Sequence, residues 1–366
     1  MPARPRKPTM QDVSRLAGVS TMTVSRALAD PGLVAQETRE RVQQAIEQLG
    51  YVPDRVAGSL SSRRTGFIAA ILPTLTNANF ADTAHGLTEV LRQAGYQLLI
   101  GHTMYDLTEE ERLIRAMLAR RPEAIVLTGA THTKAASRLL LDVGIPVVEI
   151  WELPTHPLDH TVGFSNREIG RAAARHLLAL GHRRLAALGP RADGDARDFR
   201  GEERLAGFAA VLEEQGAVPP AMIRQEPVPL SFEQGARSLA ALLEVAPEVE
   251  AVFAVSDLVA VGALMEGHRR GIRVPRDLSL MGFGDFEIGR QCVPALTTIR
   301  VDARDIGRRT GELLLRLLQV EPRGGPGDPD LIDLGFQLIQ RATTAPAERG
   351  VGPASAKPER LQHHDG

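Results

Sequence analysis

The chain opens with two short apolar patterns, one on each side of a turn at Gly18-Val19-Ser20. In the first pattern, three residues recur with the spacing of one helical face: Met10, Val13 and Ala17. The inward residues of the second pattern are Val24, Ala27 and Leu28. Thr9 suits the N-cap of the first helix, Gly18 its end, and Ser20 the N-cap of the second helix. Two helices joined by such a turn predict a helix-turn-helix.

A third helix and a linker follow. The apolar face of this helix consists of Val42, Ala45, Ile46 and Leu49. Gly50 suits its end, so residues 1–52 are predicted to form a small all-helical domain. Pro53 breaks the helix, and Gly58 weakens any helix within residues 53–65. We expect this segment to be a hinge that folds when it meets DNA.

From Gly66 onward, short apolar runs alternate with amphipathic stretches such as residues 81–93 and 168–180. The runs predict seven buried strands, at residues 67–73, 96–102, 123–129, 145–151, 183–189, 249–257 and 278–285. This alternation predicts an α/β domain with parallel sheets. The segments GLTEVLRQAGYQLLIG and GRAAARHLLALGHRRLAALG resemble each other about 85 residues apart, which favours two lobes. A ligand cleft is then expected at the carboxyl ends of the strands.

The C-terminal part completes the two lobes. Residues 297–320 predict a strand and an amphipathic helix, and residues 331–343 predict a last strand. We expect lobe one to cover about 66–161 and 295–325, and lobe two about 162–294 and 326–345. The tail, 346–366, has no heptads and is predicted to be disordered.

Charge is unevenly distributed along the chain. Through Arg64 there are ten basic and six acidic residues, whereas the whole chain has a formal net charge of −2. A basic head on an acidic body favours contact of the head with a polyanion. No apolar run approaches membrane-span length and no signal sequence is evident, and Cys292 is the single cysteine. We therefore expect a cytoplasmic protein.

The outward face of the second helix carries candidate DNA-reading residues. Its side chains can donate or accept hydrogen bonds or make methyl contacts: Thr21, Met22, Ser25 and Arg26. Such residues contact base edges when a helix lies in the major groove, and Arg26 could bind a guanine. Thr9, Ser20 and Thr23 sit at helix N-termini, which suit phosphate. The alternative is a small helical bundle with a polar face.

Polar residues after the predicted strands are candidate ligand contacts. They lie in segment 73–80 and at Thr128, His132, Glu149, Trp151, Arg197, Arg200, Arg204, Ser256, Asp257 and Asp285. Taken singly, each could be an ordinary loop residue. Taken together, they suit a small polyol with an anionic group. Arg200 is the expected partner of a carboxylate, and Asn79 and Asp257 are the expected partners of hydroxyls.

Other chemistries lack support in the sequence. The segment Gly282–Gly289 has G-x-G but lacks the third glycine of a nucleotide-binding loop. His132, His176 and His182 lack metal-ligand spacing, and no G-x-S-x-G elbow occurs. We therefore expect neither an enzyme nor a bound metal or cofactor.

The head resembles that of the lac repressor family of bacterial transcription regulators. The resemblance rests on residues 9–28 and on RVQQAIEQLGYVPDRVA, residues 41–57. It implies that Thr21, Met22 and Arg26 contact bases, that Leu60 enters the minor groove and that Arg55 belongs to the hinge. Three residues depart from the family pattern: Ala35 at the third N-cap, and Asp54 and Gly58 in the hinge.

The body resembles the effector-binding core of the same family, so the resemblance covers about 335 of 366 residues. It rests on GFIAAILPTLTNANF, GHRRLAALG, RLAGF, AVFAVSDLVAVGAL, RVPRDLSLMGFGD and PALTTIRVD. It implies that the effector contacts are Asn79, Phe80, Arg200, Ser256 and Asp257. Residues 127–149 and 160–174 are similar to the gluconate-utilisation subgroup. Gly284 stands where lactose- and purine-type members have Asp, which favours a sugar acid over a pyranose.

The resulting hypothesis is a homodimeric repressor of sugar-acid catabolism that binds a near-palindromic operator. Its DNA affinity would depend on a small effector such as gluconate or its phosphate. The alternatives are a regulator that responds to a neutral sugar and, outside regulation, a solute-binding module. The basic head argues against the second alternative.

Overall fold

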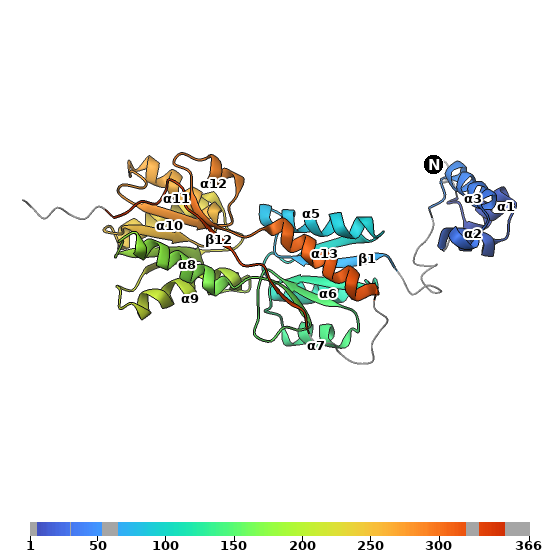
Figure 1. Ribbon diagram of the computed structural model, residues 1–366, viewed down its shortest axis with the longest axis horizontal. Helices are drawn as coiled ribbons and strands as arrows, with labels where there is room; N and C mark the ends of the chain where they lie inside the picture. Colours follow the sequence, from blue (N-terminus) through green and yellow to red (C-terminus); the bar gives the residue numbers. More distant parts are fainter. Residues whose placement is uncertain (1–5, 30, 53–64, 320–328, 348–366) are drawn as a thin grey trace, which may run out of the picture. The chain divides into compact units, whose positions relative to one another are not determined.

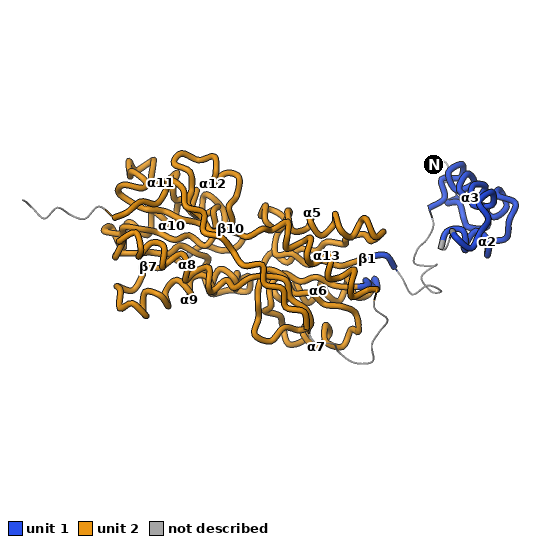
Figure 2. The backbone as a smooth tube through the Cα atoms, in the orientation of Figure 1, with its two compact units in different colours: residues 1–67, 120–123 blue, residues 68–119, 124–366 orange. Residues whose placement is uncertain are grey.

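The computed structural model describes residues 6–29, 31–52, 65–319 and 329–347 (Figure 1). The chain divides into two compact units, residues 1–67 with 120–123 and residues 68–119 with 124–366 (Figure 2). Within the described residues, no helix combines the length and the apolar composition that crossing a membrane requires.

The described residues of unit 1 form the helices α1 (Met10–Ala17), α2 (Thr21–Ala29) and α3 (Gln36–Leu49), with a 3₁₀ turn at Pro31–Leu33. Its core consists of Val13, Ala17, Val24, Val42, Ala45 and Tyr51. The other residues of the three predicted stripes are half-buried against this core. The predicted helical faces are therefore confirmed, and Tyr51 is an addition to them.

The helix ends in unit 1 follow the expected chemistry. Thr9 and Asp12 form a reciprocal capping box at α1, and Gly18 ends that helix with a left-handed φ of 68°. The Ser20 Oγ accepts a hydrogen bond from the Thr23 amide at 3.1 Å, which caps α2. Ala35 precedes α3 without a side-chain cap. The turn between α1 and α2 is thus fixed by local hydrogen bonds.

The first lobe of unit 2 is built on a six-stranded sheet with the order β11-β5-β4-β3-β1-β2. The strands are β1 (Phe67–Leu72), β2 (Gln97–His102), β3 (Ala124–Thr128), β4 (Val147–Ile150), β5 (His160–Gly163) and β11 (Leu331–Asp333). The helices of this lobe are α5 (Ala78–Gln93), α6 (Leu107–Leu118), α7 (Lys134–Asp142) and α13 (Ala303–Gln319). Helices α5 and α13 pack against each other.

The second lobe has the strand order β12-β10-β9-β8-β6-β7. The strands are β6 (Leu185–Pro190), β7 (Ala221–Glu226), β8 (Ala251–Ala254), β9 (Ser279–Phe283), β10 (Thr297–Arg300) and β12 (Gln337–Ile339). The helices are α8 (Asn166–Ala179), α9 (Phe199–Glu214), α10 (Phe232–Val245), α11 (Asp257–Arg269) and α12 (Glu287–Gln291). Strand β12 is antiparallel to β10, whereas β10, β9, β8, β6 and β7 pair in parallel.

Helices α8 and α9 approach closely because glycines lie at their crossing. A Cβ on Gly170 would stand 1.8 Å from the Arg204 carbonyl oxygen, and one on Gly207 would stand 2.0 Å from the Arg167 carbonyl oxygen. Backbone therefore packs on backbone at this contact. The crossing fixes the helix that carries Arg200 and Arg204.

The seven strands predicted from apolar runs are present, but the C-terminal part differs from expectation. The single strand expected at 331–343 is two strands, β11 in the first sheet and β12 in the second. Strand β10 belongs to the second sheet. The second stretch of lobe one therefore starts after β10 and not at the expected residue 295. Strands β5 and β7 were not predicted, because their sequences HTVG and AMIRQE contain polar residues and no long apolar run.

Candidate functional site

A cavity lies between the two lobes of unit 2. Lobe one lines it with residues that follow β1, β2 and β4, and lobe two with α9 and with residues that follow β7, β8 and β9. The cavity therefore lies at the carboxyl ends of strands of both sheets, as the sequence predicts.

Two arginines and one carboxylate form the charged centre of this cavity. Asp198 lies 3.6 Å from the guanidinium of Arg200 and 3.6 Å from that of Arg204. All three side chains are more than nine-tenths buried. Asp198 Oδ1 and Arg204 Nε have no hydrogen-bond partner within the described residues. The cluster has a formal charge of +1 and retains free donor and acceptor capacity.

Burial shifts the titration of groups around this cluster. Burial lowers the pKa of Arg204 to about 10, although Asp198 opposes the shift. Burial also raises the pKa of Tyr105, and the Asp198 carboxylate raises it further. Arg204 therefore remains charged near neutral pH, in surroundings that screen its charge weakly.

Arg200 links the lobes at the edge of the cavity. Its Nη1 donates a hydrogen bond to the Thr128 carbonyl oxygen at 3.1 Å. The guanidinium carbon lies 5.7 Å from the centre of the Phe80 ring and 6.0 Å from that of Tyr105. Arg200 is thus held by lobe one although it belongs to α9.

An aromatic wall completes the cavity. The Phe80 and Trp151 rings meet edge to face with their centres 5.2 Å apart. Trp151 has a left-handed φ of 70°, and its Nε1 donates to Thr83 Oγ1 at 3.1 Å. The Arg204 guanidinium lies 4.2 Å from the centre of the Phe283 ring. The cavity therefore combines apolar faces with a cationic centre.

Four of the predicted effector residues line this cavity: Asn79, Phe80, Arg200 and Ser256. Thr128 instead lines a neighbouring smaller cavity and contributes its carbonyl oxygen to Arg200. Ser256 also caps α11, since its Oγ accepts a hydrogen bond from the Leu258 amide at 3.3 Å. These residues are the part of the predicted site that the structure brings together.

Asp257 and Asp285 are not on the cavity wall, contrary to expectation. Asp257 is fully buried and accepts hydrogen bonds from the Phe286 amide at 2.9 Å and from Thr298 Oγ1 at 2.7 Å. Burial raises the pKa of Asp257 to about 7. Asp285 pairs with Arg341 at 2.6 Å. Both carboxylates are bonded to other parts of lobe two. Asp257 contributes to the cavity indirectly, because it accepts the hydrogen bond of the Phe286 amide and Phe286 lines the cavity.

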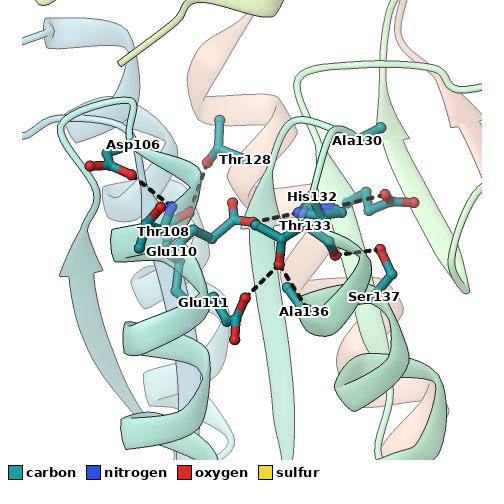
Figure 3. Close-up of polar contacts among 12 residues, drawn as sticks. Asp106, Thr108, Glu110, Glu111, Thr128, Ala130, His132, Thr133, Ala136 and Ser137 are labelled. Carbon is teal, nitrogen blue, oxygen red and sulfur yellow. Dashed lines mark hydrogen bonds and ion pairs between the residues drawn. The ribbon is translucent and has the colours of Figure 1, made fainter. Parts of the chain in front are cut away.

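His132 and Glu149 also lie elsewhere, in a buried cluster with Glu110. Figure 3 shows His132 beside Glu110. His132 Nδ1 is 2.6 Å from Glu110 Oε1, and its Nε2 is 3.2 Å from Glu149 Oε1. Glu149 Oε2 accepts the Leu158 amide hydrogen bond at 2.8 Å. Burial lowers the pKa of His132, but the two carboxylates outweigh it and raise the pKa to about 9. The cluster fixes the segment after β3.

The structure adds three cavity residues that the sequence analysis did not name, Tyr105, Asp198 and Phe286, and it also places the candidates Trp151 and Arg204 on the cavity wall. Trp151 and Arg204 follow predicted strands, so their positions alone marked them as candidates. Tyr105 has a left-handed φ of 66°, and no pattern in the sequence indicates that conformation. Its placement depends on lobe two, because the Arg197 amide donates to the Tyr105 carbonyl oxygen at 3.0 Å.

In unit 1, the outward face of α2 is available for contacts. Thr21, Met22 and Arg26 are exposed, with Met22 63% exposed. Thr23 and Ser25 are half-buried. Thr9 and Ser20 are engaged as helix caps. Arg55 and Leu60 lie outside the described residues.

Two family models match the chain. Residues 9–54 match "Bacterial regulatory proteins, lacI family", and residues 174–344 match "Periplasmic binding protein-like domain". The transcriptional regulator GntR of Pseudomonas aeruginosa is 39% identical over 339 residues, which cover 92% of this chain and 96% of that protein. Its name is that of a regulator and not of an enzyme, in agreement with the sequence-based expectation.

Solved structures agree with this assignment. A transcriptional regulator of the same family from Silicibacter pomeroyi matches with a TM-score of 0.84 and 32% identity, over 92% of this chain and 99% of that one. A lac repressor dimer bound to operator and the anti-inducer ONPF matches with a TM-score of 0.79 and 25% identity, over 93% and 100% of the two chains.

Proposed function

Since the chain belongs to the lacI family of bacterial regulatory proteins and is a DNA-binding transcriptional regulator, we propose that a small sugar acid controls its hold on operator DNA. In this proposal residues 1–52 bind DNA, residues 53–65 are the hinge, and the cavity of unit 2 binds the acid. The protein acts as a homodimeric repressor in the cytoplasm.

The observation that carries the proposal is the formal charge of the buried cluster. Two guanidiniums face one carboxylate at 3.6 Å on the cavity wall, and the further carboxylate that acts on them, that of Glu152, lines the neighbouring cavity. Within the cavity itself the donors of two cations outnumber the acceptors of one carboxylate, and an anionic ligand would accept hydrogen bonds from them. A neutral sugar would offer these donors only weaker, uncharged acceptors. A monoanion such as gluconate therefore fits the cavity better than a neutral sugar.

The remaining cavity residues suit the rest of such an acid. Asn79 and Ser256 present an amide and a hydroxyl to the cavity, and both are more than nine-tenths buried. The Phe80 and Trp151 rings offer apolar faces to the C–H groups of a sugar chain. In the proposed mode, Arg200 or Arg204 binds the carboxylate through paired N–H donors.

The head is assigned to operator recognition. Exposed Thr21, Met22 and Arg26 would contact base edges, with α2 in the major groove. One head per subunit would match a near-palindromic site. In the proposal, Leu60 inserts into the minor groove, and Arg55 is a cation of the hinge that contacts DNA.

Isothermal titration calorimetry with gluconate, glucose and 6-phosphogluconate tests the choice of ligand. We expect gluconate to bind and glucose to bind at least about 10-fold more weakly, because a charge-assisted pair contributes roughly 1.5–3 kcal/mol. Equal binding of glucose and gluconate would contradict the assignment of an acid.

A further inference from the structure

Asn166 lies where the chain first runs from lobe one into lobe two. Strand β5 of lobe one ends at Gly163, and helix α8 of lobe two begins at Asn166. Ser165 caps this helix, because its Oγ accepts a hydrogen bond from the Glu168 amide at 3.2 Å. The Asn166 side chain is therefore not needed as a cap, yet it is almost fully buried. A buried amide needs hydrogen-bond partners, and those of Asn166 indicate its role.

The two ends of this amide are bonded to different lobes. Its Nδ2 donates a hydrogen bond to the carbonyl oxygen of Trp151, in lobe one, at 3.0 Å. Its Oδ1 accepts a hydrogen bond from Nη1 of Arg204, on α9 of lobe two. Asp198 is 3.6 Å from the Arg204 guanidinium, which is longer than a hydrogen bond. Asn166 thus joins the backbone of lobe one directly to a cation on the cavity wall.

Trp151 extends this connection to the place where the chain returns to lobe one. Its Nε1 donates to Thr83 Oγ1 at 3.1 Å, and the Thr83 hydroxyl is 3.0 Å from the carbonyl oxygen of Ala303. Ala303 is the first residue of α13 and directly follows the segment that links β10 of lobe two to lobe one. A buried hydrogen-bonded route therefore leads from Ala303 through Thr83, Trp151 and Asn166 to Arg204.

Aromatic rings follow the same course as the hydrogen bonds. The Trp151 ring meets the Phe164 ring edge to face at 5.6 Å, and Phe164 belongs to the first connection between the lobes. The Phe164 ring is 6.2 Å from that of Phe283 in lobe two, on which the Arg204 guanidinium packs. The polar and the aromatic contacts thus end at the same arginine.

The backbone of Trp151 is held in a conformation that bulky residues rarely adopt. Its φ of 70° lies in the left-handed region, where a side chain costs free energy unless its surroundings hold it. Asn166 holds the Trp151 carbonyl group, and Thr83 holds the indole. A movement of one lobe against the other would have to break or rearrange the bonds of Asn166. The position of Arg204 would then change with the arrangement of the lobes.

We propose that Asn166 is a positioning residue, which sets the place of Arg204 in the cavity according to the arrangement of the lobes and so takes part in the control of DNA affinity. The inference rests on the part of the proposed function in which unit 2 controls DNA binding. It does not depend on the identity of the ligand.

The fluorescence of Trp151 reports on this residue, because the chain has a single tryptophan. Asn166→Asp keeps an acceptor for Arg204 but removes the donor to the Trp151 carbonyl group. Without ligand, we expect the emission of the full-length variant to shift to longer wavelength and to be quenched more strongly by acrylamide. Its affinity for a duplex selected for binding to the parent chain should change about 5-fold or more. Arg167→Gln, at the next and exposed position of α8, should change neither.

A second position tests the route from its other end. Thr83→Val removes the hydroxyl that accepts the indole hydrogen bond and nearly preserves the shape of the side chain. It should change both the emission and the duplex affinity in the same direction as Asn166→Asp. Thr83→Ser restores the hydroxyl and should recover most of the parent values. This pair of variants tests the inference even if Asn166→Asp does not fold.

The inference is wrong if Asn166→Asp and Thr83→Val leave the emission of Trp151 unchanged. It is also wrong if the emission changes while the duplex affinity does not, because the hydrogen bonds would then support only local packing. Calorimetry of the parent chain with gluconate decides the proposed ligand separately. If gluconate does not bind but both variants alter the emission and the duplex affinity, the sugar acid is refuted and the role of Asn166 stands.

Discussion

The Nη1 of Arg200 donates a hydrogen bond to the carbonyl oxygen of Thr128 at 3.1 Å, and the two residues belong to different lobes. A second bond between the lobes runs from the Arg197 amide to the Tyr105 carbonyl oxygen at 3.0 Å. An acid that binds Arg200 would compete with Thr128 for its donors. The arrangement of the lobes and the occupancy of the cavity are therefore expected to be coupled through Arg200.

Replacement of Arg200 tests this coupling. We expect Arg200→Ala to weaken gluconate at least about 10-fold, since a charge-assisted hydrogen bond is lost, and to leave DNA binding without ligand intact. The measurement is calorimetry together with operator binding. Arg175→Ala is the matched control, because Arg175 is half exposed on α8 of the same lobe. If Arg200→Ala bound gluconate with the affinity of the parent chain, Arg200 would not be a ligand contact.

Arg26 tests the recognition helix. We expect Arg26→Ala to weaken operator binding by roughly 1–3 kcal/mol and to relax the preference at one base pair, as the loss of a bidentate contact predicts. Selection from a randomised duplex pool measures both effects. Gln44→Ala, exposed on α3, is the control and should behave like the parent chain. An unchanged base preference would show that Arg26 does not read a base.

Salt dependence tests the role of the basic head. Operator binding should weaken steeply between about 50 and 200 mM salt, because cations of the head displace counterions from phosphates. Fluorescence anisotropy with a labelled duplex measures the slope of the logarithm of affinity against that of salt concentration. A slope near zero would mean that the head makes few phosphate contacts.

His132 predicts a pH dependence of stability. Its pKa is raised from 6.5 to about 9 in the folded chain, so its stabilising contribution is complete below about pH 6.5 and is lost as the pH rises through about 9. The contribution is about 3 kcal/mol. Urea unfolding between pH 6 and 9.5 measures it.

A variant at this position tests whether the His132 cluster, and not another titrating group, causes the pH dependence of stability. At pH 6.5, His132→Gln should be less stable than the parent chain. Between pH 6.5 and 9, its free energy of unfolding should fall much less than that of the parent chain. His156→Gln, at an exposed histidine, should retain the decline of the parent chain. An unaltered pH profile in His132→Gln would show that another group causes it.

Local patterns were sufficient for the head and for most strands. The stripe of Val13 and Ala17 and the caps at Thr9 and Gly18 depend on neighbours within a few residues, so spacing alone predicts them. The predicted strands β1, β3, β4, β6, β8 and β9 are apolar runs whose residues are almost all buried, whereas the predicted strand β2 lies at the edge of its sheet and is half-buried to exposed. Strands β5 and β7 lack that signal.

The site was predictable only in part, because long-range partners decide the role of a polar residue. Asp257 follows a strand just as Ser256 does, yet it is bound by Thr298, 41 positions away, and does not reach the cavity. His132 is bound by Glu110, 22 positions away. Asn79 and Arg200 line the cavity, because each follows a strand that ends at the cleft, and their contact with an effector stays a prediction.

The central claim is that a ligand in the cavity of unit 2 changes the affinity of unit 1 for DNA. The direct measurement is the anisotropy of a labelled duplex, selected for binding to the full chain, at increasing gluconate concentration. A change in duplex affinity of about 5- to 150-fold, typical of allosteric coupling, is expected for the parent chain and none for Arg200→Ala. Duplex affinity that stays constant up to saturating gluconate would contradict the account.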